Sequence, residues 1–371
     1  MKITFVLPFA GLQGGIRVLA IYAERLRQRG HQVAVVSTPF TMPMRRKVKS
    51  LLLGRGWPKP ELGSHFDGLN VPHQVLEKER PVLDADVPDA DVVVATYYPT
   101  AYDVLNLSRA KGAKAFFIQN YELEDGKLDP KLDATWRMPV HKIVIAKWLL
   151  KIAQEKFGDT KVSLVPNSVD LDQFHAPPRG KRPMPTVGML YATSWMKGCR
   201  TSFEALKRVA TELPLLRVIS FGAEHPGLDL RLPPYAEFHY RPPQEKIRDL
   251  YAQCDVWLCG SAREGFGLPP LEAMACRCPV VSTRVAGPLD FVQEGVNGFL
   301  VNIGDAGGLA DRLLHVLNLT QNEWTKISDA AYGTATSFTW DDATDLFERA
   351  LELTIERDRC GEFSNERKIS A

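Results

Sequence analysis

Residues 264 to 272 read EGFGLPPLE, in which two glutamates stand eight positions apart around two glycines and two prolines. The preceding residues, DVWLCGS at 255–261, are apolar enough for a buried strand of a parallel sheet. Glycines permit backbone conformations that are closed to other residues, and prolines suit the first turn of a helix. The stretch therefore predicts a strand, a tight loop and a helix that continues through LEAMAC at 271–276.

The two glutamates fall where open α/β sheets bind their ligands, at the carboxyl end of a strand. Glu264 is expected in the loop, and Glu272 in the first turn of the helix. Loop amides and the helix dipole favour an anion such as a diphosphate, and carboxylates accept hydrogen bonds from sugar hydroxyls. The alternative is that Glu272 merely complements the helix dipole while Glu264 is solvated.

The alternation of strand and helix forms two series along the chain. The first starts with KITFVLP at 2–8, the loop FAGLQGG and a helix that ends before Gly30. The second restarts with TVGML at 186–190. Because 371 residues exceed one ordinary core, we expect two doubly wound parallel-sheet α/β domains. The apolar stripe of the first helix consists of Ile16, Leu19, Ala20, Ala23 and Leu26.

The expected domain organisation has five parts. They are an N-terminal doubly wound domain at 1–174, a proline-rich basic linker at 175–185, a C-terminal doubly wound domain at 186–338, a helix at 339–358 that packs back on the N-terminal domain, and a flexible polar tail at 359–371.

The composition is that of a soluble globular protein, with 45% hydrophobic and 24% charged residues. A net charge of +2 gives no global field for a nucleic acid partner. Six cysteines without a CxxC pair favour a reducing compartment. The N-terminal run resembles a signal peptide, but Pro8 interrupts it and a buried strand explains it better. We therefore expect a cytoplasmic protein.

Other motifs are weaker. Lys197, between a predicted strand and helix, would neutralise a phosphate, although a surface lysine is by itself the commoner explanation at such a position. The GLQGG loop lacks the GxGxxG spacing and a suitably placed ribose-binding acid, which argues against a nicotinamide dehydrogenase. We expect no metal and no cofactor, because the DxD patterns lie in acidic loops or turns where chance matches are common; they are Asp84/Asp86, Asp89/Asp91 and Asp170/Asp172.

Taken together, the motifs resemble those of the family-4 retaining glycosyltransferases. The resemblance is most specific in EGFGLPPLEAMACRCPVVSTRVAGPLDFVQEGVNGFLV at 264–301. Supporting similarity lies in GGIRVLAIYAERLRQRGHQV at 14–33, VPNSVDLDQF at 165–174 and LYATSWMKG at 190–198. It implies a GT-B fold, in which two Rossmann-like domains face a cleft, with the acceptor on the N-terminal side and the nucleotide sugar on the C-terminal side.

The resemblance also implies roles for individual residues. Glu264 would hold hydroxyls of the donor sugar, Glu272 would bind the ribose diol, and Lys197 would stabilise the departing diphosphate. The last role would be shared with the backbone at Gly14 and Gly15. The nucleotide base is expected near Tyr240 and Arg241. The backbone that approaches sugar and phosphate would be that of Gly265, Phe266, Gly267 and Leu268.

Two positions depart from the family pattern. Met189 stands where the family usually has a diphosphate-binding arginine, for which Arg200 or Arg263 would have to substitute. Gln119 and Asn120 stand where the family often has a histidine near the donor sugar, which leaves the general base unassigned.

A basic segment at 42–59 carries six Lys and Arg residues and no acid, together with Leu51 to Leu53 and Trp57. It would form an interfacial helix on an anionic membrane, or a cradle for a lipid-linked acceptor. The alternative is a solvated loop, because these apolar residues lack clean helical spacing.

The sequence thus predicts a metal-independent retaining glycosyltransferase. It would move a sugar from a nucleoside-diphosphate donor to a hydroxyl of a glycan, lipid-linked or small-molecule acceptor, in polysaccharide or envelope biosynthesis. One rival is a nucleotide-sugar 2-epimerase, which product analysis without acceptor would reveal. The other is a non-catalytic nucleotide-sugar-binding protein, which would bind donor without turnover.

Overall fold

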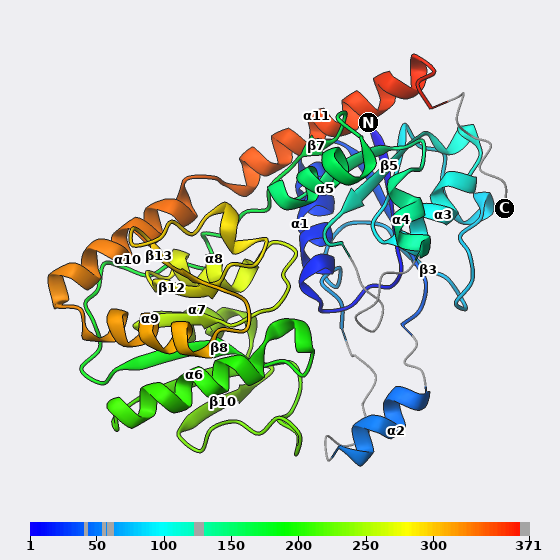
Figure 1. The fold of residues 1–371 in the computed structure, drawn as a ribbon. Coiled ribbons are helices and arrows are strands. Elements are labelled where there is room, and N and C mark those ends of the chain that lie inside the picture. The colour runs from blue at the N-terminus through cyan, green and yellow to red at the C-terminus, as the bar shows by residue number, and fades with distance from the viewer. Residues whose placement is uncertain (41–43, 54–56, 58–62, 122–129, 364–371) are drawn as a thin grey trace. The chain divides into compact units, whose positions relative to one another are not determined.

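The chain forms two compact units, seen in a computed structural model that describes all residues except 41–43, 54–56, 58–62, 122–129 and 364–371 (Figure 1). The first unit contains Met1–Pro43, Lys59–Asn167 and Asp341–Ala371. The second contains Met44–Pro58 and Ser168–Trp340.

The described residues of the first unit form a seven-stranded parallel sheet in the order β3-β2-β1-β4-β5-β6-β7. The strand order reverses beside β1, which pairs with both β2 and β4, as in a doubly wound fold. The strands are β1 (Lys2–Leu7), β2 (Gln32–Ser37), β3 (His73–Val75), β4 (Val92–Ala95), β5 (Ala113–Ile118), β6 (His141–Val144) and β7 (Ser163–Leu164).

The helices of the first unit pack through apolar faces. The predicted stripe of the first helix is confirmed, because all five of its residues are buried, and Gly30 follows that helix at φ +89°. The helices are α1 (Gly14–Gln28), α3 (Tyr98–Asn106), α4 (Pro130–Trp136), α5 (Lys147–Phe157) and α11 (Trp340–Arg359), with short 3₁₀ turns η1 (Asp84–Asp86) and η2 (Arg109–Lys111).

The C-terminal helix α11 packs on the core of the first unit. The buried ring of Phe347 lies 4.4 Å from the ring of Tyr22 in α1 and 5.1 Å from that of Phe117 in β5. At the rim, Arg29 donates to Asp345 at 2.6 Å and also bonds Glu348. Arg359, the first residue of the expected tail, is the last residue of this helix. Residues 360–363 follow it, and the remainder of the expected tail lies outside the described residues.

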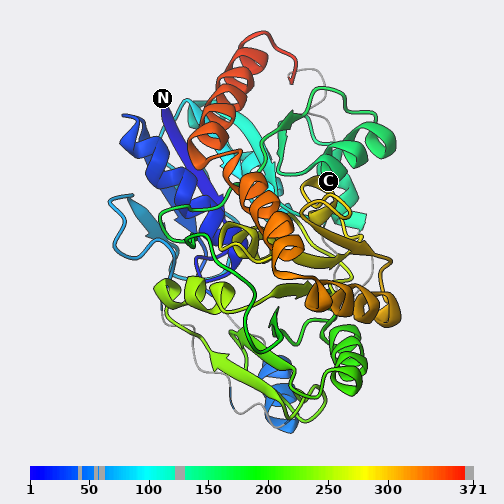
Figure 2. The same cartoon turned by 90° about the vertical axis from the view of Figure 1, so that its left-hand side faces the viewer.

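In the second unit the described residues form a six-stranded parallel sheet in the order β10-β9-β8-β11-β12-β13. Its strands are β8 (Thr186–Leu190), β9 (Arg217–Gly222), β10 (Ala236–Tyr240), β11 (Val256–Cys259), β12 (Val280–Thr283) and β13 (Gly298–Val301). Helices α6 and α9 lie side by side, as do α8 and α10 (Figures 1 and 2). The helices and 3₁₀ turns are α2 (Met44–Leu52), η3 (Trp195–Lys197), α6 (Cys199–Glu212), α7 (Gln244–Ala252), α8 (Leu268–Ala275), η4 (Pro288–Asp290), α9 (Ala306–Asn318) and α10 (Gln321–Thr336).

The segment 175–185, expected to be a linker, is bonded into the second unit. The ammonium of Lys181 donates to the carbonyls of Leu317 and Leu319, at 2.6 and 2.7 Å. The amide of Arg182 donates to the buried carboxylate of Asp255 at 2.7 Å. These bonds fix the chain where it enters β8. The longer of the two segments of the second unit starts at Ser168, before the expected linker.

We expect Phe347→Ala to lower the free energy of unfolding of the first unit by about 3–5 kcal/mol, because it empties a closely packed aromatic site. Urea unfolding followed by circular dichroism measures the change. Leu353→Ala, at a side chain of α11 that is 40% exposed, is the control and should cost about 0.5 kcal/mol. Equal stability of the two variants would contradict the packing of α11 described above.

Candidate functional site

The EGFG stretch forms the predicted loop between β11 and α8. Gly267 has φ +88°, a left-handed conformation that other residues rarely adopt, and two prolines follow in the first turn of α8. Gly287 packs against this loop so closely that an added Cβ would overlap the carbonyl of Phe266. The glycines therefore hold the loop in one shape at the carboxyl end of β11.

Glu264 is buried in this loop and fully engaged. The ammonium of Lys197 donates to both carboxylate oxygens, at 3.0 and 2.8 Å, and the hydroxyl of Ser261 donates to Oε1 at 2.7 Å. The interpretation of Glu264 as a solvated residue is therefore wrong. Sequence reasoning identified Glu264 and Lys197 separately but did not predict that they pair, and it did not single out Ser261.

Lys197 reaches Glu264 because two loops approach closely. Gly198 has φ +58°, and an added Cβ there would overlap the carbonyl of Gly260 at the end of β11. The carbonyl of Met196 accepts hydrogen bonds from the amides of Ala262 and Arg263, at 2.8 and 3.1 Å. The backbone thus fastens the lysine loop to the glutamate loop.

The ion pair sets the charge of the lysine. Burial lowers the pKa of the Lys197 ammonium, but attraction to Glu264 and the hydrogen bonds with it outweigh burial and raise that pKa above its ordinary value. The pKa of Lys197 is higher in the folded protein than in the unfolded chain. The contribution of this ion pair to the free energy of unfolding is therefore complete at pH values below the pKa of Lys197 in the unfolded chain. It is lost as the pH rises through the folded pKa. A positive charge is therefore held at this site at neutral pH.

Glu272 is buried in α8, where its Oε2 accepts a hydrogen bond from the hydroxyl of Tyr251 in α7 at 2.9 Å. The expected position in the first turn is wrong. The helix begins at Leu268, so Glu272 is its fifth residue and lies in the second turn. Its contact with Tyr251, rather than the helix dipole alone, accounts for its burial.

A pocket at the end of β11 joins several of these groups. Lys197 and Glu264 line it together with Gly260, Ser261, Pro269 and Pro270. It contains a cation and a carboxylate held by hydrogen bonds, beside the N-terminus of α8. Such an arrangement suits a ligand that carries both an anionic group and hydroxyls.

Tyr240 and Arg241 lie together at the end of β10 in the same unit. The exposed ring of Tyr240 stacks on His225 with 3.7 Å between ring centroids, and the Arg241 guanidinium lies 5.5 Å from the Tyr240 ring. Arg241 has φ +44° and donates from Nε to the carbonyl of Ala223 at 3.1 Å. Sequence reasoning missed His225, which had no motif around it.

Gly14 and Gly15 lie in the first unit, at the start of α1. The side-chain amide of Gln119, at the end of β5, donates to the carbonyl of Gly15 at 3.0 Å. Gln119 therefore lies against the glycine turn, at the position where a histidine was expected from the family pattern. The role of the two glycines in binding a diphosphate stays a prediction.

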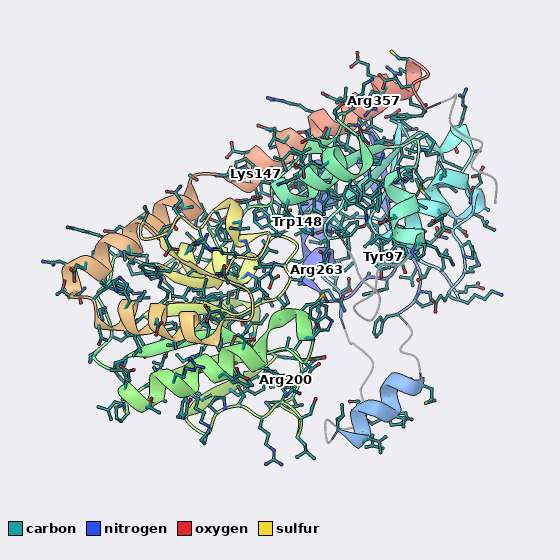
Figure 3. The ribbon with its side chains drawn as sticks, viewed as in Figure 1. Tyr97, Lys147, Trp148, Arg200, Arg263 and Arg357 are labelled. Atoms are coloured by element: carbon teal, nitrogen blue, oxygen red, sulfur yellow. The ribbon has the colours of Figure 1, made fainter. Side chains whose placement is uncertain are left out.

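The two candidate arginines differ in position (Figure 3). Arg200, near the start of α6, donates to the carbonyl of Asp229 at 2.9 Å. Arg263 precedes Glu264 in the glutamate loop. Its backbone amide donates to the carbonyl of Met196, the residue before Lys197. Met189 is buried in β8 among apolar residues. The backbone thus holds Arg263 beside the lysine loop.

In the part of the chain that the structure describes, no group of three or more His, Cys, Asp or Glu residues is placed to hold a metal ion. The aspartates of the DxD patterns have structural contacts there. Asp86 is paired with Arg80 at 2.6 Å, Asp89 with Lys111 at 2.8 Å, and Asp170 accepts from the amide of Asp172 at 3.0 Å.

Residues 184–319 match the family model described as Glycosyl transferases group 1. N-acetyl-alpha-D-glucosaminyl L-malate synthase of Bacillus anthracis is 42% identical over 74 residues, which are 20% of this chain and 19% of that protein. D-inositol 3-phosphate glycosyltransferase of Mycobacterium tuberculosis (strain F11) is 33% identical over 173 residues, 42% of this chain and 36% of that protein. The alignments thus span about a fifth and about a third of these curated relatives.

Solved structures are similar over nearly the whole chain. Anabaena Alr3699/HepE in complex with UDP and glucose has a TM-score of 0.69 at 18% identity, covering 95% of this chain and 99% of that one. Sucrose-phosphate synthase from Thermosynechococcus elongatus has a TM-score of 0.72 at 14% identity, covering 96% and 99%. The predicted α/β class and GT-B fold are confirmed.

We expect Glu264→Gln to move the pKa of Lys197 from above to below its ordinary value, because burial then acts without the opposing carboxylate. Carbon NMR of the reductively methylated protein measures this pKa. Glu224→Gln is the control, since Glu224 bonds Thr193 in the neighbouring loop. A Lys197 pKa that stays raised in Glu264→Gln would contradict the pairing described here.

Proposed function

We propose that the protein is a retaining glycosyltransferase that moves a sugar from a nucleoside-diphosphate donor to a hydroxyl acceptor without a metal ion. The observation that carries the proposal is the Lys197–Glu264 pair at the end of β11, inside the region that matches the glycosyl transferases group 1 model. When a donor binds, the carboxylate of Glu264 would accept from the sugar hydroxyls and the ammonium of Lys197 would contact the diphosphate.

The donor would use three features of the second unit. Its sugar hydroxyls would donate to Glu264, its diphosphate would lie near Lys197 and the start of α8, and its ribose diol would bond Glu272. Each glutamate is already oriented by a hydroxyl, from Ser261 or Tyr251. The solved Anabaena complexes contain UDP, UDP-glucose or UDP with glucose, which makes UDP-glucose the first donor to test.

Lys197 would act chiefly by electrostatics. Negative charge develops on the diphosphate as the sugar departs, and a cation fixed beforehand stabilises that charge without reorganisation. A sugar hydroxyl that donates to Glu264 would replace one of the hydrogen bonds from Lys197 to that carboxylate. The ammonium would then be able to donate to a phosphate oxygen instead. We expect the phosphate oxygen to help remove the acceptor's proton, so that transfer retains the anomeric configuration without a carboxylate nucleophile.

The acceptor would be a hydroxyl of a glycan, a lipid-linked sugar or a small molecule, in polysaccharide or envelope biosynthesis. The names of the two curated relatives point to small polar acceptors, a malate and an inositol phosphate. An acceptor panel should therefore include small hydroxy acids and polyols as well as glycans.

We expect Lys197→Ala and Glu264→Gln each to lower turnover about 100-fold or more, because each removes a group that acts on the reacting sugar or its leaving diphosphate. Released nucleoside diphosphate gives the rate, and proton NMR of the product gives the anomeric configuration. The control is Glu237→Gln, which disrupts the partly exposed Arg217–Glu237 pair of the same unit and should keep near-normal turnover.

Near-normal turnover in either site variant would remove that residue from the site. An inverted product would contradict the retaining mechanism. Isomerised sugar nucleotide without acceptor would favour the 2-epimerase, and donor binding without turnover over the whole panel would favour a non-catalytic binder.

A further inference from the structure

The helix α2 exposes an apolar stripe. Met44, Val48, Leu51 and Leu52 stand at positions i, i+4, i+7 and i+8, which share one face of a helix. All four are exposed, from 42% for Val48 to 77% for Leu52. The alternative of a solvated loop is therefore wrong over 44–52, because it considered only Leu51 to Leu53 and Trp57 and left out Met44 and Val48.

The remaining positions of α2 are mainly basic. The nine residues include Arg45, Arg46, Lys47 and Lys49, and no acid occurs from Phe40 to Pro60. The apolar positions thus share one face of the helix, and the cationic positions lie beside and opposite that face. A helix of this composition is typical of segments that lie in a membrane interface.

Other exposed apolar side chains adjoin the end of α2. The amide of Leu228, in the second unit, donates to the carbonyl of Leu53 at 3.3 Å, and the Leu228 side chain is 63% exposed. Trp57, five residues after α2, is 52% exposed. An exposed indole is favoured at the boundary between headgroups and acyl chains.

The charge decides between possible occupants of this surface. A second copy of the chain, packed stripe to stripe, would bring two sets of four cations together, which is repulsive. A nucleic acid would meet the cations but leave the leucines in water. An anionic lipid surface satisfies both, since its headgroups attract the cations and its acyl region receives the apolar stripe.

We propose that α2, together with Trp57 and Leu228, is a surface that binds anionic lipid bilayers peripherally. No helix in the described ranges is long and apolar enough to cross a membrane. The nine residues of α2 are too few to span a bilayer, so the stripe inserts at the interface, and the association is reversible and weakened by salt. This inference stands independently of the proposed transfer reaction.

The test is flotation of the full-length protein with vesicles of phosphatidylcholine alone or mixed with phosphatidylglycerol. We expect at least about tenfold stronger binding to the anionic vesicles, most of it lost at high salt. Leu51→Asp/Leu52→Asp and Arg45→Glu/Arg46→Glu should each lower binding about tenfold or more, with circular dichroism unchanged.

Two controls match these variants in chemistry. Leu215→Asp alters a leucine of the second unit that is 73% exposed, and Lys151→Glu/Lys207→Glu makes the same change of charge at exposed positions of α5 and α6. Both should bind as the unaltered protein does. No binding to anionic vesicles at low salt overturns the proposal, as does equal binding to both vesicle types or full binding by the α2 variants. Self-association without vesicles that Leu51→Asp/Leu52→Asp abolishes would also overturn it, in favour of a second copy.

Discussion

The site depends on an ion pair between two loops that are far apart in the sequence, in which the carboxylate is buried and the ammonium is partly exposed. Lys197 and Glu264 are separated by 67 positions, and their charges meet because Gly198 lets its loop approach the end of β11. A cation is expensive to bury unless it is paired. The carboxylate therefore keeps a charged lysine in place before any ligand arrives, and in the proposed function the same carboxylate would offer oxygens to a sugar.

Hydroxyl groups complete the arrangement. Ser261 donates to Glu264 within one loop, whereas Tyr251 donates to Glu272 from a neighbouring helix. Each glutamate thus has one oxygen fixed by a buried neutral donor, which limits its rotation without adding charge. In the account proposed here, the two carboxylates bind different sugars of one donor, and the tight turn between them sets their separation.

Local sequence patterns predicted the strands at 2–8 and 186–190, the buried stripe of α1, and the loop and prolines before α8. Those features depend on periodicity and on the special backbone of glycine and proline. Long-range contacts were not predictable in the same way. The pairing of Lys197 with Glu264, the bond from Tyr251 and the stacking of His225 on Tyr240 depend on strand order. The sequence left the segment at 42–59 open between an interfacial helix and a solvated loop, because Leu51 to Leu53 and Trp57 alone lack helical spacing, whereas the stripe of α2 also includes Met44 and Val48.

The central claim is that the second unit binds a nucleoside diphosphate through Lys197 and the glycine loop without metal. The most direct measurement is calorimetric titration of UDP, GDP, dTDP and ADP into the full-length protein in the presence of EDTA. The account predicts tight binding of one of these diphosphates, with an affinity that added Mg²⁺ or Mn²⁺ leaves unchanged. Binding that occurs only after a divalent metal is added, or no binding under either condition, would contradict it.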